Sequence, residues 1–200
     1  LAEEESFLDE LGLYIIKEAC KDAQKLQKEG TPLSISVNIS PKQLESAVFV
    51  REVRRILQEV DLHDIQLILE VTERSLLSTS GRILERIREL KQLGIQMSMD
   101  DFGMGHSSMM YLQENAFDEV KLDGSLVRQI LENERSRDIV RGITRLAASM
   151  QFHVVAEFVE TREQMELLKA LHCDIYQGYY YGKPCSCDEF IIKYLKQEPR

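Results

Sequence analysis

The sequence lacks a long apolar run. No stretch approaches the roughly 20 consecutive apolar residues that a membrane-spanning helix requires. The first residues, Leu1–Glu5 (LAEEE), are acidic, which excludes a secretory signal peptide. We therefore expect a cytoplasmic domain that does not itself contact a membrane, whether or not its parent protein is membrane-tethered. Because the chain does not begin with Met, we also expect it to be part of a longer protein.

Cysteine is scarce, and its spacing does not match a metal site. The four cysteines are Cys20, Cys173, Cys185 and Cys187, and no two of them form a Cys-x-x-Cys pair. This pattern is not that of a disulfide framework or a zinc site. It favours reduced thiols, which are typical of cytoplasmic proteins.

Positive charge is also in deficit. The chain has 25 Lys and Arg residues against 34 Asp and Glu residues, which gives a formal net charge of -9. Duplex DNA and anionic membranes both require a basic face, so neither is expected as the main partner. An anionic ligand remains compatible with this charge if metal ions mediate its binding. The length of 200 residues and the 44% hydrophobic content suit one folded domain.

Apolar runs alternate with helical patterns along the whole chain. The spacing predicts helices over residues 4–29, 41–60, 79–93, 107–114, 125–150, 161–171 and 187–196, with a break around Asn133 in the fifth of them. Thr161 and Gln164 have the spacing of a capping box at the start of the helix over 161–171. Between the helices the spacing predicts strands over residues 33–40, 65–71, 95–99, 117–122, 152–156 and 173–176. Strands joined by helical crossovers pair in parallel, as in an open doubly wound sheet or a closed (β/α)8 barrel. A typical barrel has about 250 residues and eight strands, so about the first two strands would be missing here.

The predicted strands end in residues suited to metal binding or proton transfer. These residues are Asn38, Glu70, Asp100 with Asp101, Lys121, Glu157 and Gln177. The carboxyl ends of parallel strands face one rim of a barrel or one edge of a sheet, so the side chains should converge. Carboxylates with one amide suit hard cations such as Mg²⁺ or Mn²⁺. Two such ions about 4 Å apart can activate a water and hold a phosphate oxygen, as phosphodiester hydrolysis requires.

Ordinary structural roles also fit these residues one by one. The pair Asp100–Asp101 fits an acidic turn. Lys121 fits a lysine with a buried stem that pairs with Asp123. Glu157 and Glu160 fit acids at the entry to a helix. Their recurrence at one strand end after another favours a shared site over a series of unrelated turns.

Short motifs over nearly the whole chain resemble the EAL domain, the bacterial cyclic di-GMP phosphodiesterase family. They are LAEE at 1–4, VNIS at 37–40, LEVTE at 69–73, DDFGMGHSS at 100–108, KLD at 121–123, VVAEFVET at 154–161, QGY at 177–179 and KP at 183–184. The resemblance implies one domain over residues 1–200 with a modified TIM (β/α)8 barrel, incomplete at its N-terminus. It implies hydrolysis of cyclic di-GMP to linear pGpG with Mg²⁺ or Mn²⁺. The Glu-Ala-Leu signature, with a further metal ligand, would precede Leu1.

The resemblance also implies a role for each matching residue. Those implied to bind the two metal ions are Asn38, Glu70, Asp100, Asp101 and Glu160. Those implied to handle the attacking water are Glu157 as base, Lys121 and Gln177. Glu73 would brace the loop after Asp101, and Asp123 would bind substrate. A homodimer through that loop and the next helix is implied, with other signalling domains in the parent chain.

Four positions depart from the family pattern. Met104 replaces Thr, His106 replaces Tyr, Phe158 replaces Gly, and Gly124 stands where many members carry Arg. These departures keep a second hypothesis open: a degenerate EAL domain that binds cyclic di-GMP or a protein partner without hydrolysis. A third hypothesis is another Mg²⁺-dependent barrel enzyme that acts on a small phosphate ester.

Overall fold

The computed structural model divides the chain into two compact units. It describes residues 2–27, 33–60, 62, 65–76, 82–103 and 108–196. Unit 1 comprises Leu1–Glu70, Ser80–Gln96 and Pro184–Arg200, and unit 2 comprises Val71–Thr79 and Met97–Lys183. The prediction that residues 1–200 form a single domain stays a prediction.

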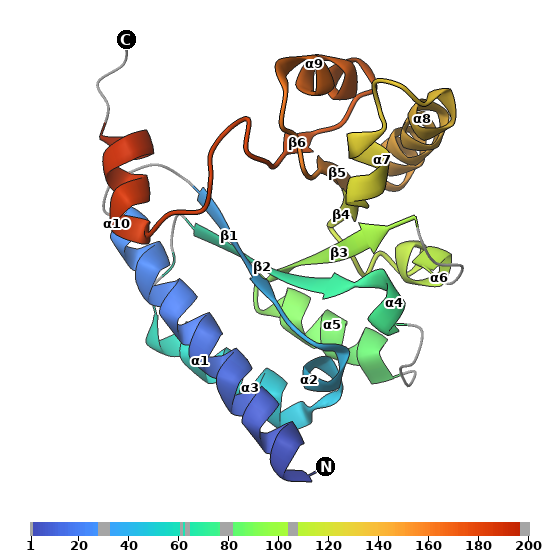
Figure 1. The fold of residues 1–200 in the computed structure, drawn as a ribbon. Helices are drawn as coiled ribbons and strands as arrows, with labels where there is room; N and C mark the ends of the chain where they lie inside the picture. The colour runs from blue at the N-terminus through green and yellow to red at the C-terminus, as the bar shows by residue number, and fades with distance from the viewer. Residues whose placement is uncertain are drawn as a thin grey trace. The chain divides into compact units, whose positions relative to one another are not determined.

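Unit 1 contains the long N-terminal helix and the first two strands (Figure 1). Its elements are α1 (Ala2–Gln27), β1 (Leu33–Asn38), α2 (Pro41–Glu45), α3 (Ala47–Glu59), most of β2 (Ile65–Thr72), α5 (Arg82–Gln92), α10 (Cys187–Phe190) and the π-helix η1 (Ile191–Leu195). Helix α1 packs on β1 and α3, and α3 packs on α5. Phe49, Val53 and Ile56 of α3 recur at helical spacing and are buried, which accounts for the packed face of this helix.

The single helix predicted over residues 41–60 is wrong: two helices occupy this stretch. Ser40 caps α2 in a capping box with Gln43, and Ser46 begins α3 by accepting a hydrogen bond from the Phe49 backbone N–H. Ser46 has an extended backbone conformation, which interrupts the helical ladder between the two. Its hydroxyl also donates to Asp9 Oδ2 of α1 at 3.1 Å, which fixes the bend.

Unit 2 contains the remaining strands and the helices between them. Its elements are α4 (Glu73–Leu76), most of β3 (Gln96–Phe102), α6 (Ser108–Gln113), β4 (Glu119–Leu122), α7 (Gly124–Arg128), α8 (Glu134–Met150), β5 (His153–Ala156), α9 (Arg162–Ala170) and β6 (Ile175–Tyr176). Asn133 caps α8, as the predicted break there requires. Thr161 and Gln164 form the predicted capping box of α9.

The strand order supports a barrel rather than a doubly wound sheet. The order is β1-β2-β3-β4-β5-β6, which follows the chain without reversal. Within unit 1, β1 and β2 pair in parallel, and within unit 2, β3, β4, β5 and β6 pair in parallel in that order. A doubly wound sheet would reverse its strand order at a switch point. The six predicted strands are therefore confirmed, and their order distinguishes between the two predicted architectures.

Buried aliphatic side chains form the interior of each unit. In unit 2, Val120 and Leu122 on one face of β4 and Val154 and Ala156 on one face of β5 have no exposed surface. On the alternate faces, Lys121 and Val155 are each only 4% exposed, so these strands are covered on both faces. In the part of the chain that the structure describes, no helix combines the length and apolarity needed to cross a bilayer.

Candidate active site

Asn38 and Glu70 occupy matching positions on the two strands of unit 1. Asn38 ends β1 and lies opposite Glu70 of β2 in the parallel register. The Ile39 N–H donates to the Glu70 carbonyl oxygen at 2.9 Å, which holds the two strand ends together. Glu70 is only 5% exposed, whereas Asn38 is exposed. Unit 1 thus brings together one buried carboxylate and one amide from the predicted ligand set.

Asp100 and Asp101 lie inside the end of β3, not in a turn after it. The β3–β4 register shifts between Met99 and Phe102, so the two aspartates form an irregularity in the strand. Asp101 has a left-handed backbone (φ 55°), and its N–H donates to Asp100 Oδ1 at 2.9 Å. This distortion explains why the predicted strand end at Met99 is too early.

Negative charge accumulates around Asp101. Partial burial raises the pKa of the Asp101 carboxyl, and the neighbouring Asp100 and Asp123 carboxylates raise that pKa further. The positive charges of Arg74 and Lys121 oppose the shift but do not cancel it. A divalent cation beside these oxygens would relieve this repulsion.

Lys121 and Glu157 form an ion pair at the ends of adjacent strands. Lys121 lies on β4, and Glu157 directly follows β5. Lys121 Nζ lies 2.7 Å from Glu157 Oε1, and both side chains are largely buried. The structure therefore places beside each other two of the three residues predicted to handle the attacking water.

Asp123, Glu157 and Gln177 lie at one level of the sheet. Each follows a member of the paired set Leu122, Ala156 and Tyr176. The Gln177 N–H donates to the Ala156 carbonyl oxygen at 2.8 Å, which continues the ladder beyond β6. The Asp123 side chain accepts from the Ser125 N–H and so caps α7. The capping contact is an ordinary structural role for Asp123, and its predicted substrate contact stays a prediction.

Glu73 and Glu160 are each linked to a neighbouring segment of unit 2. Glu73, at the start of α4, is 1% exposed, and its Oε2 accepts from the Gly103 N–H at 3.1 Å. This contact joins Glu73 to the residue that follows β3, as a bracing role requires. The exposed Glu160 precedes α9, and its N–H donates to Gln164 Oε1 at 2.8 Å. The capping box thereby fixes the Glu160 backbone.

A cavity of about 290 Å³ opens beside Glu157 in unit 2. Its lining includes Glu157, Glu160 and Gln177 together with Arg128, Phe158 and Tyr179. Phe158 and Tyr179 expose 43% and 60% of their surfaces. The cavity therefore combines acidic, amide and guanidinium groups with aromatic faces, a composition suited to a polar ligand with flat rings.

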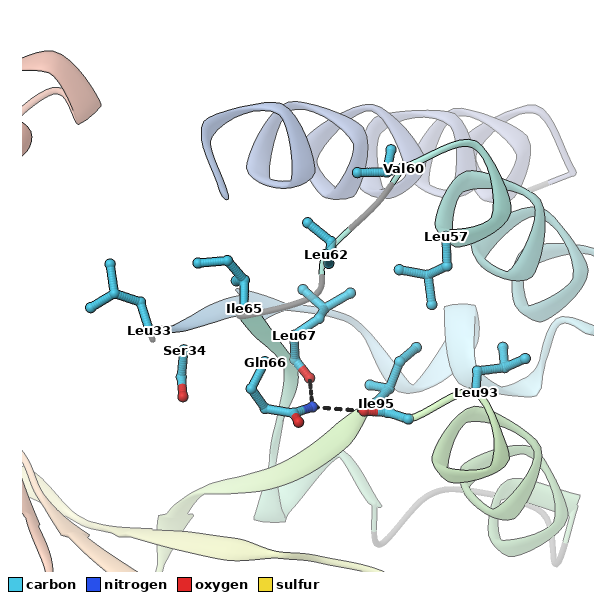
Figure 2. A pocket seen from close by; sticks show the side chains of 11 residues that line it. Leu33, Ser34, Leu57, Val60, Leu62, Ile65, Gln66, Leu67, Leu93 and Ile95 are labelled. Carbon is cyan, nitrogen blue, oxygen red and sulfur yellow. Dashed lines mark hydrogen bonds between the residues drawn. The ribbon is translucent and has the colours of Figure 1, made fainter. Parts of the chain in front are cut away.

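A larger hollow of about 670 Å³ lies in unit 1, away from the predicted ligands of that unit. It is bordered by the first residues of β1 and β2, whereas Asn38 and Glu70 lie at the other ends of these strands. Figure 2 shows mainly aliphatic side chains around it, with the Gln66 amide bonded to the carbonyl oxygens of Leu67 (3.0 Å) and Gly94 (2.7 Å). Among the described residues that line it there is no acid, amine or imidazole, so the larger volume of this hollow does not make it the better candidate for the active site.

The predicted donor set has the chemistry that hard divalent cations prefer. Its members are carboxylate and amide oxygens, the ligands that such ions prefer. Among the described residues, no group of three or more His, Cys, Asp and Glu side chains is gathered closely enough to hold a metal. The predicted ligands come from both units, Asn38 and Glu70 from unit 1 and the remaining ones from unit 2.

Sequence patterns did not identify Arg128 as part of the site. Arg128 ends α7, and its guanidinium carbon lies 4.2 Å from the centroid of the Phe158 ring. This contact depends on the backbone of Phe158, which no periodicity encodes. Met104 and His106, two of the departures from the family pattern, lie outside the described residues.

Comparison with known proteins identifies the family. The profile of the EAL domain matches residues 1–184, and the chain belongs to the EAL domain family. An uncharacterized signaling protein of Caulobacter vibrioides is 40% identical over 192 residues, covering 96% of this chain and 23% of that protein. The cyclic di-GMP phosphodiesterase NbdA of Pseudomonas aeruginosa is 34% identical over 198 residues, covering 97% and 25%. The chain thus spans about a quarter of the length of these curated relatives.

Solved structures agree with the family assignment and the architecture. The PaMucR phosphodiesterase in complex with c-di-GMP superposes with a TM-score of 0.82 at 32% identity, covering 95% of this chain and 77% of that chain. The six parallel strands with their helices are therefore part of a (β/α)8 barrel of the EAL type. The predicted family and fold class are confirmed.

Proposed function

We propose that this domain hydrolyses cyclic di-GMP to linear pGpG in bacterial second-messenger signalling. The observation that carries the proposal is the largely buried Lys121–Glu157 ion pair at 2.7 Å, because it places an amine and a carboxylate at adjacent strand ends beside a cavity. Membership of the EAL family and the similarity to the cyclic di-GMP phosphodiesterase NbdA support the same reaction. In this reaction water adds to phosphorus, one P–O3′ bond breaks, and the 3′-oxygen leaves with a proton.

Separate residues of the domain would accept the proton, orient the water and contact the substrate. Glu157 accepts the proton of the attacking water, and Lys121 orients Glu157 and stabilises the charge that develops on phosphate oxygen. Gln177 hydrogen-bonds the water, and Asp123 contacts the substrate. Glu73 holds the backbone after β3 through Gly103 N–H, which keeps the aspartates in place.

Two Mg²⁺ or Mn²⁺ ions would be held by five side chains of this domain. They are Asn38, Glu70, Asp100, Asp101 and Glu160, all oxygen donors. When bound, such ions lower the pKa of a bound water and polarise the phosphate. The charge around Asp101 supports this assignment, since two of its neighbours that raise its pKa are carboxylates.

A second candidate function is cyclic di-GMP binding without turnover. Phe158 favours it, because this bulky side chain directly follows the proposed base and adopts a left-handed backbone (φ 55°). A shift of Glu157 by about 1 Å would lower the rate by two orders of magnitude without preventing binding. Measurement of binding and turnover on the same protein separates the two functions.

We also propose a homodimer, further signalling domains in the parent protein, and a cytoplasmic location. Met109 and Met110 of α6 are each 52% exposed on the helix that follows the aspartates, which supports a protein contact there. The greater length of the relatives supports additional domains. The free state of all four cysteines supports a reducing compartment.

The test of the proposed function uses the full-length protein and its Glu70→Ala variant. With Mg²⁺ or Mn²⁺ present, the wild-type protein should convert cyclic di-GMP to pGpG, and Glu70→Ala should abolish conversion because a buried metal ligand is lost. Gln66→Ala, at the opposite end of β2, is the control and should retain activity. Tight binding of cyclic di-GMP by the intact protein with no turnover would refute the enzyme proposal.

A further inference from the structure

Phe158 has a backbone conformation that its side chain disfavours. Its φ is 55°, in the left-handed region, where glycine is at ease and a bulky L-residue is uncommon. Such a conformation persists only where the surrounding structure enforces it, and it is found preferentially at functional sites. The contacts of the Phe158 ring therefore require an explanation.

Helix α7 holds this ring from two of its residues. Gly124 lies so close to it that a Cβ atom there would be 2.4 Å from Phe158 Cδ2 and 2.6 Å from Phe158 Cε2. Only a residue without a side chain leaves room for the ring at this distance. At the other end of α7, the Arg128 guanidinium carbon lies 4.2 Å from the ring centroid, within the range of a cation–π interaction.

The backbone on both sides of Phe158 belongs to the candidate site. Glu157 precedes it and pairs with Lys121 at 2.7 Å. Val159 follows it, and the Val159 N–H donates to the Gln177 carbonyl oxygen at 3.0 Å. Gly178 approaches the same segment so closely that a Cβ atom there would lie 2.2 Å from the Val159 carbonyl oxygen. A displacement of Phe158 would therefore move both Glu157 and the Gln177 segment.

We propose that Gly124 and Arg128 are positioning residues that hold the Phe158 ring and, through its backbone, set the place of Glu157 at the 290 Å³ cavity. This inference rests on the proposed phosphodiesterase function for its kinetic consequence. Gly124 and Phe158 form a matched pair: the large side chain at 158 requires the absence of one at 124. The Phe158 departure from the family pattern is, in this account, compatible with catalysis because Gly124 accompanies it.

A double-mutant cycle in the full-length protein tests the pair. Gly124→Ala should lower kcat for cyclic di-GMP by roughly tenfold to hundredfold, because the new Cβ displaces the ring and misplaces Glu157. KM should change by less than about threefold, because the substitution removes none of the charged or amide groups that line the cavity. Phe158→Gly alone should lower kcat less than Gly124→Ala does. In the Phe158→Gly background, Gly124→Ala should cost less than about twofold, because the clash is gone.

Arg128 variants test the other contact. Arg128→Leu should lower kcat severalfold, and Arg128→Lys should recover part of the loss, because a lysine keeps a cation over the ring. The matched control is Arg135→Leu on α8, an exposed arginine of the same unit, which should leave kcat unchanged. Equal losses for Arg128→Leu and Arg135→Leu would contradict a specific role for the Arg128–Phe158 contact.

Melting temperatures of the same variants distinguish the failure of this inference from that of the proposed function. If the wild-type protein turns over no cyclic di-GMP, the proposed function is wrong, and the positioning pair is then judged by the melting temperatures alone. Recovery of the Gly124→Ala melting temperature by Phe158→Gly supports the pair. Additive effects of the two substitutions, on melting temperature or on kcat, overturn the proposed pair. An unchanged kcat for Gly124→Ala in an active protein also overturns it.

Discussion

The surroundings of Asp101 disfavour the charged form of its carboxyl. It combines a left-handed backbone with a carboxyl whose pKa is raised by burial and by the Asp100 and Asp123 carboxylates. A residue selected for stability alone would be neutral here. The loss of folding stability that this charge causes is explained if the carboxylate binds a cation, since functional positions often lower stability.

Replacement of the Asp101 carboxylate should therefore raise the stability of the metal-free protein and weaken its binding of Mg²⁺. In metal-free buffer, Asp101→Asn should raise the melting temperature by up to about 3 °C, because it removes like-charge repulsion and Asn tolerates the left-handed conformation. Addition of Mg²⁺ should raise the melting temperature of the wild-type protein but not that of the variant. Scanning calorimetry measures both shifts. Equal stabilisation of the two proteins by Mg²⁺ would contradict a ligand role for Asp101.

The Lys121–Glu157 pair should be stabilising only while both partners are present. Lys121→Met should destabilise the protein by about 3 kcal/mol, because it leaves a largely buried carboxylate without its ammonium partner. Lys121→Met combined with Glu157→Gln should restore part of this loss, since neither charge remains. Urea unfolding of the two variants and the wild-type protein provides the comparison. If the double variant were less stable than Lys121→Met alone, the pair would not be the source of the effect.

At the scale of elements, periodicity was sufficient to predict the strands but not the irregularities. The strands follow from apolar runs, and the breaks at Asn133 and Thr161 follow from capping residues. The break at Ser46 was missed because its cap depends partly on Asp9 of α1, far away in sequence. Helix α4 was missed because four residues carry too little periodicity.

Strand periodicity predicts candidate site residues only where they coincide with strand ends, whereas Glu73, Asp123 and Glu160 were predicted from the family motifs. Asn38, Glu70, Lys121 and Glu157 are predicted as site residues because parallel strands place their carboxyl ends on one side. The contribution of Arg128 could not be predicted, since it depends on the left-handed backbone of Phe158 and on the close approach of Gly124. These are three-dimensional contacts with no sequence period.

The capping box of α9 links an element to the site. Thr161→Ala should lower the free energy of unfolding by about 1 kcal/mol, because the Gln164 N–H loses its side-chain acceptor. Ser149→Ala on the exposed side of α8 is the control and should change stability by less than about 0.5 kcal/mol. Chemical denaturation gives both values. A Thr161→Ala variant as stable as the control would show that the cap contributes nothing.

At the scale of the whole molecule, the predicted ligands are spread over most of the chain. Asn38 and Glu70 belong to unit 1, and Asp100, Asp101 and Glu160 belong to unit 2. A ligand that binds only the folded protein stabilises it by mass action, by about 2.7 kcal/mol at a concentration of 100 times Kd. Ligand binding should therefore be visible in the unfolding of the whole protein.

Stabilisation by bound cyclic di-GMP can be measured with Glu157→Gln, a variant that should bind the dinucleotide without hydrolysing it. Glu157→Gln should be stabilised by cyclic di-GMP with Mg²⁺, because the proposed base is lost while the metal ligands remain. Glu70→Ala should not be stabilised under the same conditions, since it lacks a metal ligand. Thermal unfolding with and without the dinucleotide measures the difference. Equal stabilisation of Glu70→Ala and Glu157→Gln would contradict the proposal that dinucleotide binding depends on the metal ligand Glu70.

Product analysis in water labelled with ¹⁸O tests the proposed hydrolysis of cyclic di-GMP directly. The full-length protein is incubated with cyclic di-GMP and Mg²⁺ or Mn²⁺, and the products are measured by mass spectrometry. Hydrolysis by an activated water predicts linear pGpG with one ¹⁸O atom in its terminal 5′-phosphate. Cyclic di-GMP that binds to the protein but remains intact would contradict the claim and leave the domain as a binding module.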